Sequence, residues 1–202
     1  MSFRKEYKVR LNHYGSYQLK LKLYNLGMKK LYPARKIHSL YFDSSKFISF
    51  YHSEEGVVPR KKIRIRSYPQ LSRLPNYDDY FNLEIKFSSL EGRYKKSKKI
   101  LRNYYNNLIT NGFLDSSYGV CFPRVNVEYE RSYFKLNEFR ITFDKDITFY
   151  DNKGSNMIRD FEQVLEIKCQ KNITDDHILS FLHTQNVRFS KYERAMKSVY
   201  NI

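Results

Sequence analysis

The chain has 202 residues, 41% of them hydrophobic and 17% aromatic, which excludes a disordered chain and is enough for one domain, 1–202, with a real core. The formal net charge of +16 favours a polyanion as partner, whether a nucleic acid, an acidic membrane or another polymer of negative groups. Two cysteines and no recognisable signal peptide favour the cytosol and reduced thiols, and no apolar run approaches the roughly 20 residues that span a bilayer.

Alternating polar and apolar residues predict about eight β-strands. They lie at residues 3–11, 36–43, 60–68, 80–87, 94–101, 124–134, 139–144 and 163–169. The 19 tyrosines and 15 phenylalanines suit the pleated surface of such strands. Eight strands are enough to form a closed or nearly closed antiparallel barrel.

Helices are fewer in the predicted fold. They are expected at residues 14–30, at 103–110, at 175–184 with Thr174 as the cap, and from about Ser190 onwards. In the first of them Leu19, Leu21 and Leu23 also alternate as a strand would, so a strand stays an alternative there. Loops rich in turn residues are predicted at 69–79, 112–119 and 151–160. The predicted fold class is therefore α+β, mainly antiparallel β, with a few flanking helices.

One predicted strand, "RKKIRIRSY", places four cations on one face. Arg60, Lys62, Arg64 and Arg66 share one parity, while Ile63 and Ile65 share the other. Neighbouring cations on that face would lie about 6.6 Å apart and repel by roughly 0.6 kcal/mol per pair in water. A solvated outer face is one interpretation. The other turns the charged faces inward, so that the lumen of a tunnel-like barrel is cationic and an anionic ligand offsets the repulsion.

A few acids occur among these cations. The tetrapeptide "LEIK" appears twice and sets Glu84 beside Lys86 and Glu166 beside Lys168 on a strand face. Such glutamates can be internal salt-bridge partners, which is the interpretation favoured for Glu84. A carboxylate among phosphates is also the usual ligand of Mg²⁺ or Mn²⁺, and Glu166 is the best candidate for that role.

Eight motifs in order carry a family resemblance. They are "RKEYKV", "SLYFDSSKF", "RKKIRIRSY", "NLEIKF", "VEYERSYF", "FRITFDKDI", "QVLEIKC" and "RFSKYERA". Together they resemble the VTC-type polyphosphate polymerase domain of the triphosphate tunnel metalloenzyme (CYTH-like) superfamily. The resemblance implies an eight-stranded antiparallel tunnel that binds ATP and a divalent metal and transfers the γ-phosphate onto a growing inorganic polyphosphate chain.

The resemblance and the strand alternation together imply roles for individual residues. The predicted catalytic residues are Lys8, Arg64, Arg66, Lys86, Arg131 and Arg140. The predicted substrate-binding residues are Arg60, Lys62, Lys96, Lys98, Tyr129, Lys168, Arg188 and Lys191. Glu166 and Glu6 are the predicted ligands of Mn²⁺ or Mg²⁺. In the "KKSKK" run Lys95 and Lys98 stay alternatives to Lys96 for the lysine of that strand.

The sequence departs from the broader superfamily at its first motif. E-x-E-x-K is replaced here by Arg4, Glu6 and Lys8, which favours the polymerase branch over hydrolases that use several glutamates. A triphosphate or polyphosphate hydrolase and a non-catalytic polyphosphate or nucleic-acid binder remain alternatives. For the polymerase the expected partners are ATP and polyphosphate without nucleic acid, and the expected location is the cytoplasm, at a membrane only through a membrane protein.

Overall fold

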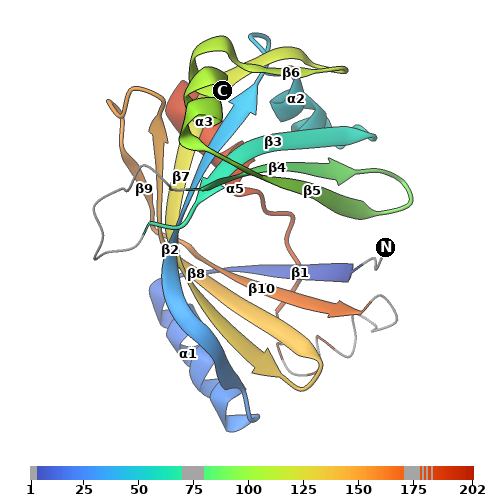
Figure 1. Cartoon of the computed structure of the whole chain (residues 1–202). Coiled ribbons are helices and arrows are strands. Elements are labelled where there is room, and N and C mark those ends of the chain that lie inside the picture. The colour runs from blue at the N-terminus through green and yellow to red at the C-terminus, as the bar shows by residue number, and fades with distance from the viewer. Residues whose placement is uncertain (1–3, 70–79, 171–177, 179, 181, 183) are drawn as a thin grey trace. The chain divides into compact units, whose positions relative to one another are not determined.

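The computed structural model describes residues 4–69, 80–170, 178, 180, 182 and 184–202 (Figure 1). Its helices are α1 (His13–Asn25), α2 (Ile48–Glu55), α3 (Arg102–Asn111) and α5 (Lys191–Tyr200). Its strands are β1 (Arg4–Leu11), β2 (Lys29–Asp43), β3 (Arg60–Ser67), β4 (Phe81–Ser88), β5 (Arg93–Ile100), β6 (Phe113–Asp115), β7 (Gly119–Leu136), β8 (Phe139–Asp151), β9 (Ile158–Asp160) and β10 (Gln163–Gln170). No helix among the described residues is long and apolar enough to cross a membrane.

The strands form one sheet in the order β1-β10-β8-β7-β2-β3-β4-β5, with β6 paired to β7 and β9 paired to β8. The registers within this sheet are antiparallel, for example between β1 and β10 and between β3 and β4. The predicted fold class, mainly antiparallel β with a few helices, is confirmed. Within the described ranges no pairing joins β1 to β5, so the sheet is not closed as a barrel.

Two compact units divide the chain. Unit 1 comprises residues 1–36, 129–147 and 159–189, and unit 2 comprises residues 37–128, 148–158 and 190–202. The long strands β2, β7 and β8 contribute residues to both units. The two cysteines are both buried, Cys169 in the core of unit 1 and Cys121 in the core of unit 2.

The core of unit 1 lies on one face of its strands. Val9 on β1, Ile141 on β8 and Ile167 on β10 are buried there together with Leu19 and Leu23 of α1. Asn12 caps α1, since its side chain accepts a hydrogen bond from the backbone N–H of Gly15 at 2.7 Å. The opposite face of these strands is therefore left for the polar residues that alternate with the core residues.

Unit 2 has the same plan. Ile63 and Ile65 on β3 and Leu83 on β4 pack with Leu108 of α3 in a second buried cluster. The apolar faces of the strands are covered by helices in both units, as the inward-facing interpretation of the charges requires. Lys62, Arg64 and Arg66 thus occupy the face of β3 that does not pack on α3, while Lys61 shares the side of Ile63 and binds Asp115.

Two helix boundaries differ from the prediction. The helix predicted at 14–30 ends at Asn25, because Gly27 adopts φ +94° and the N–H groups of Gly27 and Met28 turn back to the carbonyls of Tyr24 and Leu23. Helix α2 was not predicted, since its N-cap Phe47 offers no capping side chain. The buried Asp43 serves instead and accepts from the N–H groups of Ser49 and Phe50.

The remaining predicted segments agree in place or lie outside the described residues. Helices α3 and α5 match the predictions at 103–110 and from Ser190, where the Ser190 side chain accepts from the N–H of Glu193. The predicted loops at 112–119 and 151–160 contain the short strands β6 and β9. Thr174, most of the helix predicted at 175–184 and most of the loop at 69–79 fall outside the described residues.

Candidate functional site

In unit 2 a cationic face is built by the register of strands β2 to β5, which run side by side in Figure 1. Arg64 lies opposite Tyr41 on β2 and opposite Glu84 on β4. Lys62 lies opposite Lys86, which in turn lies opposite Lys95 on β5. We call Lys62, Arg64, Arg66, Lys86 and Lys95 the β3–β5 cationic face.

Glu84 is the counter-charge at the centre of this face and is only 3% exposed. Its carboxylate accepts from Arg64 Nε at 2.8 Å and from Lys95 Nζ at 2.6 Å, and it lies 3.8 Å from Arg66 Nη1. Burial alone would raise the pKa of Glu84, but the positive charges of Arg64 and Arg66 outweigh it and lower the pKa to about 2. The prediction that Glu84 is an internal salt-bridge partner is confirmed.

Tyr41 lies next to the same guanidinium groups and is buried. Arg64 Nη1 donates to its hydroxyl at 3.0 Å. Burial would raise the pKa of Tyr41, but Arg64 and Arg66 lower it to about 8. The excess of positive charge on this face therefore acts on a neutral neighbour as well as on Glu84.

The lysine row Lys62, Lys86 and Lys95 spans three neighbouring strands. Like charges about 5 Å apart on facing strands repel by about 0.8 kcal/mol per pair in water and about fourfold more near a protein surface. Helix α5 supplies a counter-charge, because Lys62 Nζ lies 2.7 Å from Glu193 Oε1 and 2.9 Å from Ser190 Oγ. Tyr192 of the same helix stacks on Tyr41 with ring centroids 5.0 Å apart.

Three predicted residues of unit 2 do not lie on this face. Lys96 and Lys98 are opposite Ile85 and Leu83, so they belong to the apolar side of the sheet, where their ammonium groups lie 5.5 Å and 5.8 Å from the ring centroids of Phe87 and Tyr104. Arg60 has the right parity, yet its Nη1 donates to the carbonyls of Gly56 and Val57 at the end of α2.

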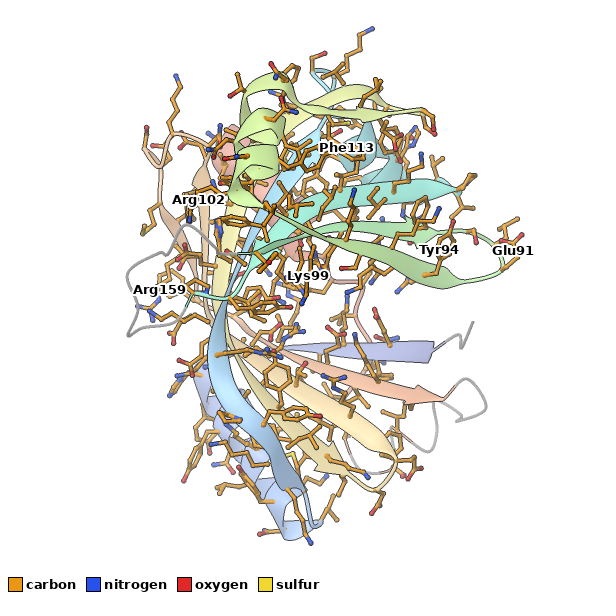
Figure 2. The ribbon with its side chains drawn as sticks, in the orientation of Figure 1. Glu91, Tyr94, Lys99, Arg102, Phe113 and Arg159 are labelled. Carbon is orange, nitrogen blue, oxygen red and sulfur yellow. The ribbon has the colours of Figure 1, made fainter. Side chains whose placement is uncertain are left out.

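The assignment of Lys96 and Lys98 to the charged face is therefore corrected in favour of Lys95. Lys99, which Figure 2 labels on β5, shares the parity of Lys95 and lies opposite Asn82. Lys191, another predicted residue, is half-buried at the first position of α5.

Unit 1 carries a second charged face, on which acids and cations are more evenly matched. Lys168 Nζ lies 3.0 Å from Glu166 Oε1 and 3.5 Å from Glu6 Oε1, so it holds both predicted metal ligands around one ammonium group. In the register Glu166 lies between Lys8 on β1 and Thr142 on β8, and Lys168 lies opposite Arg140. We call this set the β1–β10–β8 face.

Arg131 is engaged by a buried carboxylate. Its Nε and Nη2 lie 2.6 Å and 2.7 Å from the two oxygens of Asp144, which is fully buried, and Nη2 lies 3.7 Å from Glu166 Oε2. A bidentate pair of this kind fixes the guanidinium, so Arg131 of β7 is held within reach of Glu166 on β10, two strands away in the sheet. Tyr129 lies under the same guanidinium, with its ring centroid 5.3 Å from Arg131 Cζ.

The other predicted residues of unit 1 are more dispersed. Lys8 Nζ donates to the carbonyl of Phe189 at 3.0 Å. Arg140 is exposed and its guanidinium carbon lies 5.9 Å from the ring centroid of Tyr133. Arg188 is exposed in the segment that precedes α5. The structure thus brings Glu6, Glu166 and Lys168 together with Arg131 and leaves Arg140 and Arg188 at the solvent.

The oxygen donors around Glu166 fit a divalent ion of the Mg²⁺ or Mn²⁺ type. The Thr142 hydroxyl, on the strand position opposite Glu166, is buried and makes no hydrogen bond in the described part of the chain. No group of three or more His, Cys, Asp or Glu side chains among the described residues is placed to hold a metal. Mg²⁺ usually takes only one or two protein carboxylates and completes its shell with water and substrate phosphates, which Glu166 and Glu6 could satisfy.

The model of one protein family covers nearly the whole chain. It describes the VTC domain and matches residues 3–118 and 115–200. The chain belongs to the VTC domain family. The resemblance that the eight sequence motifs indicated is thereby confirmed.

Solved structures share the fold of this VTC domain. A "putative adenylate cyclase" from Vibrio parahaemolyticus aligns with a TM-score of 0.56 at 13% identity, over 97% of this chain and 98% of that chain. A protein of the same description from Bacillus halodurans gives a TM-score of 0.59 at 11% identity, over 94% of both chains. No curated protein matches the sequence.

A more remote structure is the RNA triphosphatase Pct1 of S. pombe, in complex with the Spt5 CTD. It is 11% identical over 82% of this VTC domain and 62% of the Pct1 chain, with a TM-score of 0.32. That score is too low to carry an argument. The fold agrees with the predicted triphosphate tunnel metalloenzyme (CYTH-like) superfamily.

Sequence reasoning missed several residues of the charged faces in this VTC domain. Asp144 lies in the motif "FRITFD" at the parity of the predicted Arg140, so alternation could have indicated it. Tyr41 lies in "SLYFD", a strand without a predicted site residue. Glu193 and Tyr192 on α5 reach the β3–β5 cationic face through the fold alone. No local pattern in the sequence connects α5 with β3.

Proposed function

We propose that this VTC domain binds the triphosphate of ATP on its charged faces and transfers the γ-phosphate onto a growing polyphosphate chain, with Mn²⁺ or Mg²⁺ as cofactor. The observation that carries the proposal is the β3–β5 cationic face. Five cations gather on this face, and Glu84 and Glu193 are carboxylates that contact them in the described part of the chain. The side chains of Lys62, Arg64 and Arg66 are only 21%, 19% and 11% exposed, so solvent neutralises their charge poorly.

Each residue has a distinct part in this proposal. Arg64 and Arg66 present planar guanidinium groups that suit phosphate oxygens, while Glu84 holds them in place through the ion pairs described above. Lys62, Lys86 and Lys95 add point charges along the row. In unit 1, Glu166 and Glu6 would hold the divalent ion, which when bound neutralises charge on non-bridging phosphate oxygens.

The chemistry asks little more of the protein. Phosphoryl transfer depends on in-line positioning and on neutralising charge rather than on covalent help. The acceptor is the terminal phosphate of a polyphosphate chain, which is already anionic at neutral pH, and ADP leaves as the bond between the γ-phosphorus and the bridging oxygen breaks. The proposed polymerase therefore needs no general base, in keeping with the lack of an obvious catalytic set among its five histidines.

A product assay tests the proposal. Purified protein is incubated with ATP and Mn²⁺, and the products are separated on a polyacrylamide gel stained for polyphosphate. Long chains are expected from the unmodified protein and should be absent from the Arg66→Ala variant. Orthophosphate without chains would contradict polymerase activity, and the absence of any turnover would favour a non-catalytic polyphosphate binder.

Hydrolysis of triphosphate or short polyphosphate is the second candidate. It needs an acid that orients the attacking water, for which Glu84 and Glu6 are the candidates. Glu84 is committed to ion pairs with Arg64 and Lys95, and the proposal already assigns Glu6, which lies 3.5 Å from Lys168, to the divalent ion. These contacts favour phosphoryl transfer to a phosphate acceptor over transfer to water.

A further inference from the structure

Helix α1 has an exposed apolar stripe in addition to its buried face, and the stripe touches the core of unit 1 at one end, where the Tyr24 ring packs on Phe134. Ser16, Leu19 and Leu23 form its buried face. The α1 stripe consists of Tyr14, Tyr17, Leu21 and Tyr24, which are 70%, 57%, 43% and 45% exposed. Steps of three, four and three residues align these side chains along one line of the helix, and the 3.6-residue turn sets that line opposite the buried face. The helix thus has two apolar sides, of which the core of unit 1 buries one and contacts the other at Tyr24.

The α1 stripe lies in the longest part of the chain that lacks acids. No Asp or Glu occurs between Glu6 and Asp43. The exposed cations of this part are Arg10, Lys29, Lys30, Arg35 and Lys36, and Lys22 is half-buried. Lys22 is in the last turn of α1, and Lys29 and Lys30 open β2 directly after the helix. This part of the chain therefore contributes positive charge alone to the surroundings of the stripe, and from other elements Lys145 and Glu130 lie near Lys20 of α1.

We propose that the α1 stripe docks the protein on an anionic lipid surface. Tyrosine rings and leucine side chains enter the boundary between headgroups and acyl chains, where a tyrosine hydroxyl keeps polar contact. Lysine ammonium groups beside them reach anionic headgroups, each adding attraction near such a surface. An interfacial helix needs this combination of a narrow apolar stripe with cations at its margin.

Charge favours a lipid surface over other occupants of the stripe. A second copy of the chain would bring the same cations together across the interface, and each copy carries a net charge of +16. A protein partner with mixed surface charges would require acidic as well as basic residues on this segment, and no Asp or Glu occurs between Glu6 and Asp43. A headgroup layer is negative throughout and needs no such pattern.

Vesicle binding tests the proposal. Vesicles of phosphatidylcholine alone are compared with vesicles that also contain phosphatidylserine, in a sedimentation assay. The test variant combines Tyr14→Ser, Tyr17→Ser and Leu21→Gln and leaves Tyr24, whose ring packs on Phe134 of the core. The control combines Leu90→Ser, Leu114→Ser and Phe161→Ser, which are 87%, 76% and 87% exposed elsewhere. Circular dichroism verifies that both variants fold.

Both variants keep the net charge, so they separate insertion of the stripe from attraction of the whole basic surface. We expect the stripe variant to bind phosphatidylserine vesicles at least about tenfold more weakly than the unmodified protein and the control. Equal binding by the stripe variant would overturn the proposal. So would equal binding of the unmodified protein to phosphatidylcholine alone, or a dimer that the stripe variant loses.

A fluorescent reporter gives a second measurement that does not depend on affinity. The chain has no tryptophan, so a single one reports its own surroundings. Tyr17→Trp lies on the stripe, and Tyr80→Trp is the matched control, since the two tyrosines are 57% and 60% exposed. Phosphatidylserine vesicles should shift the emission of Tyr17→Trp to the blue and leave Tyr80→Trp unchanged. An unshifted Tyr17→Trp, or equal shifts in both, would overturn the proposal.

Discussion

Replacing Glu84 by Gln removes the charge that Arg64, Arg66 and Lys95 share, with little change in side-chain size. The pKa of this carboxyl falls from 4.5 to about 2 in the folded chain, where it is 3% exposed. At ~1.4 kcal/mol per pKa unit, the charge of Glu84 contributes about 3 kcal/mol to the free energy of unfolding at neutral pH. In a chain of this size the variant should lose about 6–12 °C in Tm.

The pH dependence of the loss has a defined sign. Because the pKa of Glu84 is lower in the folded state than in the unfolded state, its contribution is complete above pH 4.5 and is lost as the pH falls towards 2. The difference in stability between the unmodified protein and Glu84→Gln should therefore be constant from pH 7 to pH 5 and shrink below pH 4.5.

Urea unfolding followed by circular dichroism measures this difference. The matched control is Glu91→Gln, at the exposed tip of the β4–β5 hairpin in Figure 2, which should unfold like the unmodified protein. Inorganic triphosphate should raise the Tm of Glu84→Gln by more than it raises that of the unmodified protein, because the ligand replaces the missing counter-charge. A Glu84→Gln variant as stable as Glu91→Gln, or a difference that ignores pH, would refute the reasoning.

Three further predictions follow from the two charged faces. Arg66→Ala should lower the turnover of ATP at least about hundredfold, as measured by steady-state kinetics. It should cost less than about 2 kcal/mol of stability in urea unfolding, since Glu84 keeps Arg64 and Lys95 as partners. A larger loss of stability would count against a binding role for Arg66. Lys95→Ala should weaken triphosphate binding, measured by calorimetry, at least about fivefold, and Lys96→Ala should leave it unchanged. Of the two lysines only Lys95 shares the face of Arg64. Equal losses of affinity in the two variants would contradict the register. Glu166→Gln should weaken Mn²⁺ binding at least about tenfold, as measured by electron paramagnetic resonance without substrate. Unchanged Mn²⁺ binding would show that Glu166 is not a ligand.

The alternation of residues was sufficient to predict most strands and the two faces of each. In β3 the cations from Lys62 to Arg66 and the isoleucines between them separate by parity. The second "LEIK" likewise places Leu165 and Ile167 in the core with Glu166 on the other face. Alternation fails in "KKSKK", because lysines occupy both parities of β5 and only the pairing with β4 shows that Lys95 faces Glu84.

The contacts that the sequence could not supply are those made between distant segments. Asp43 caps α2 from outside the helix, so no local capping residue marks the start of that helix. Glu193 reaches Lys62 across 131 positions of sequence. Asp144 engages Arg131 because β7 and β8 are neighbours in the sheet, a fact that strand periodicity does not contain.

Calorimetric titration with inorganic triphosphate is the most direct measurement of what the two charged faces are for. It is made on the unmodified protein, on Arg66→Ala in unit 2 and on Lys168→Ala in unit 1. The tunnel predicted from the sequence requires one triphosphate per chain and a Kd that rises at least about tenfold in either variant. Two independent sites, or no heat of binding at all, would contradict the account.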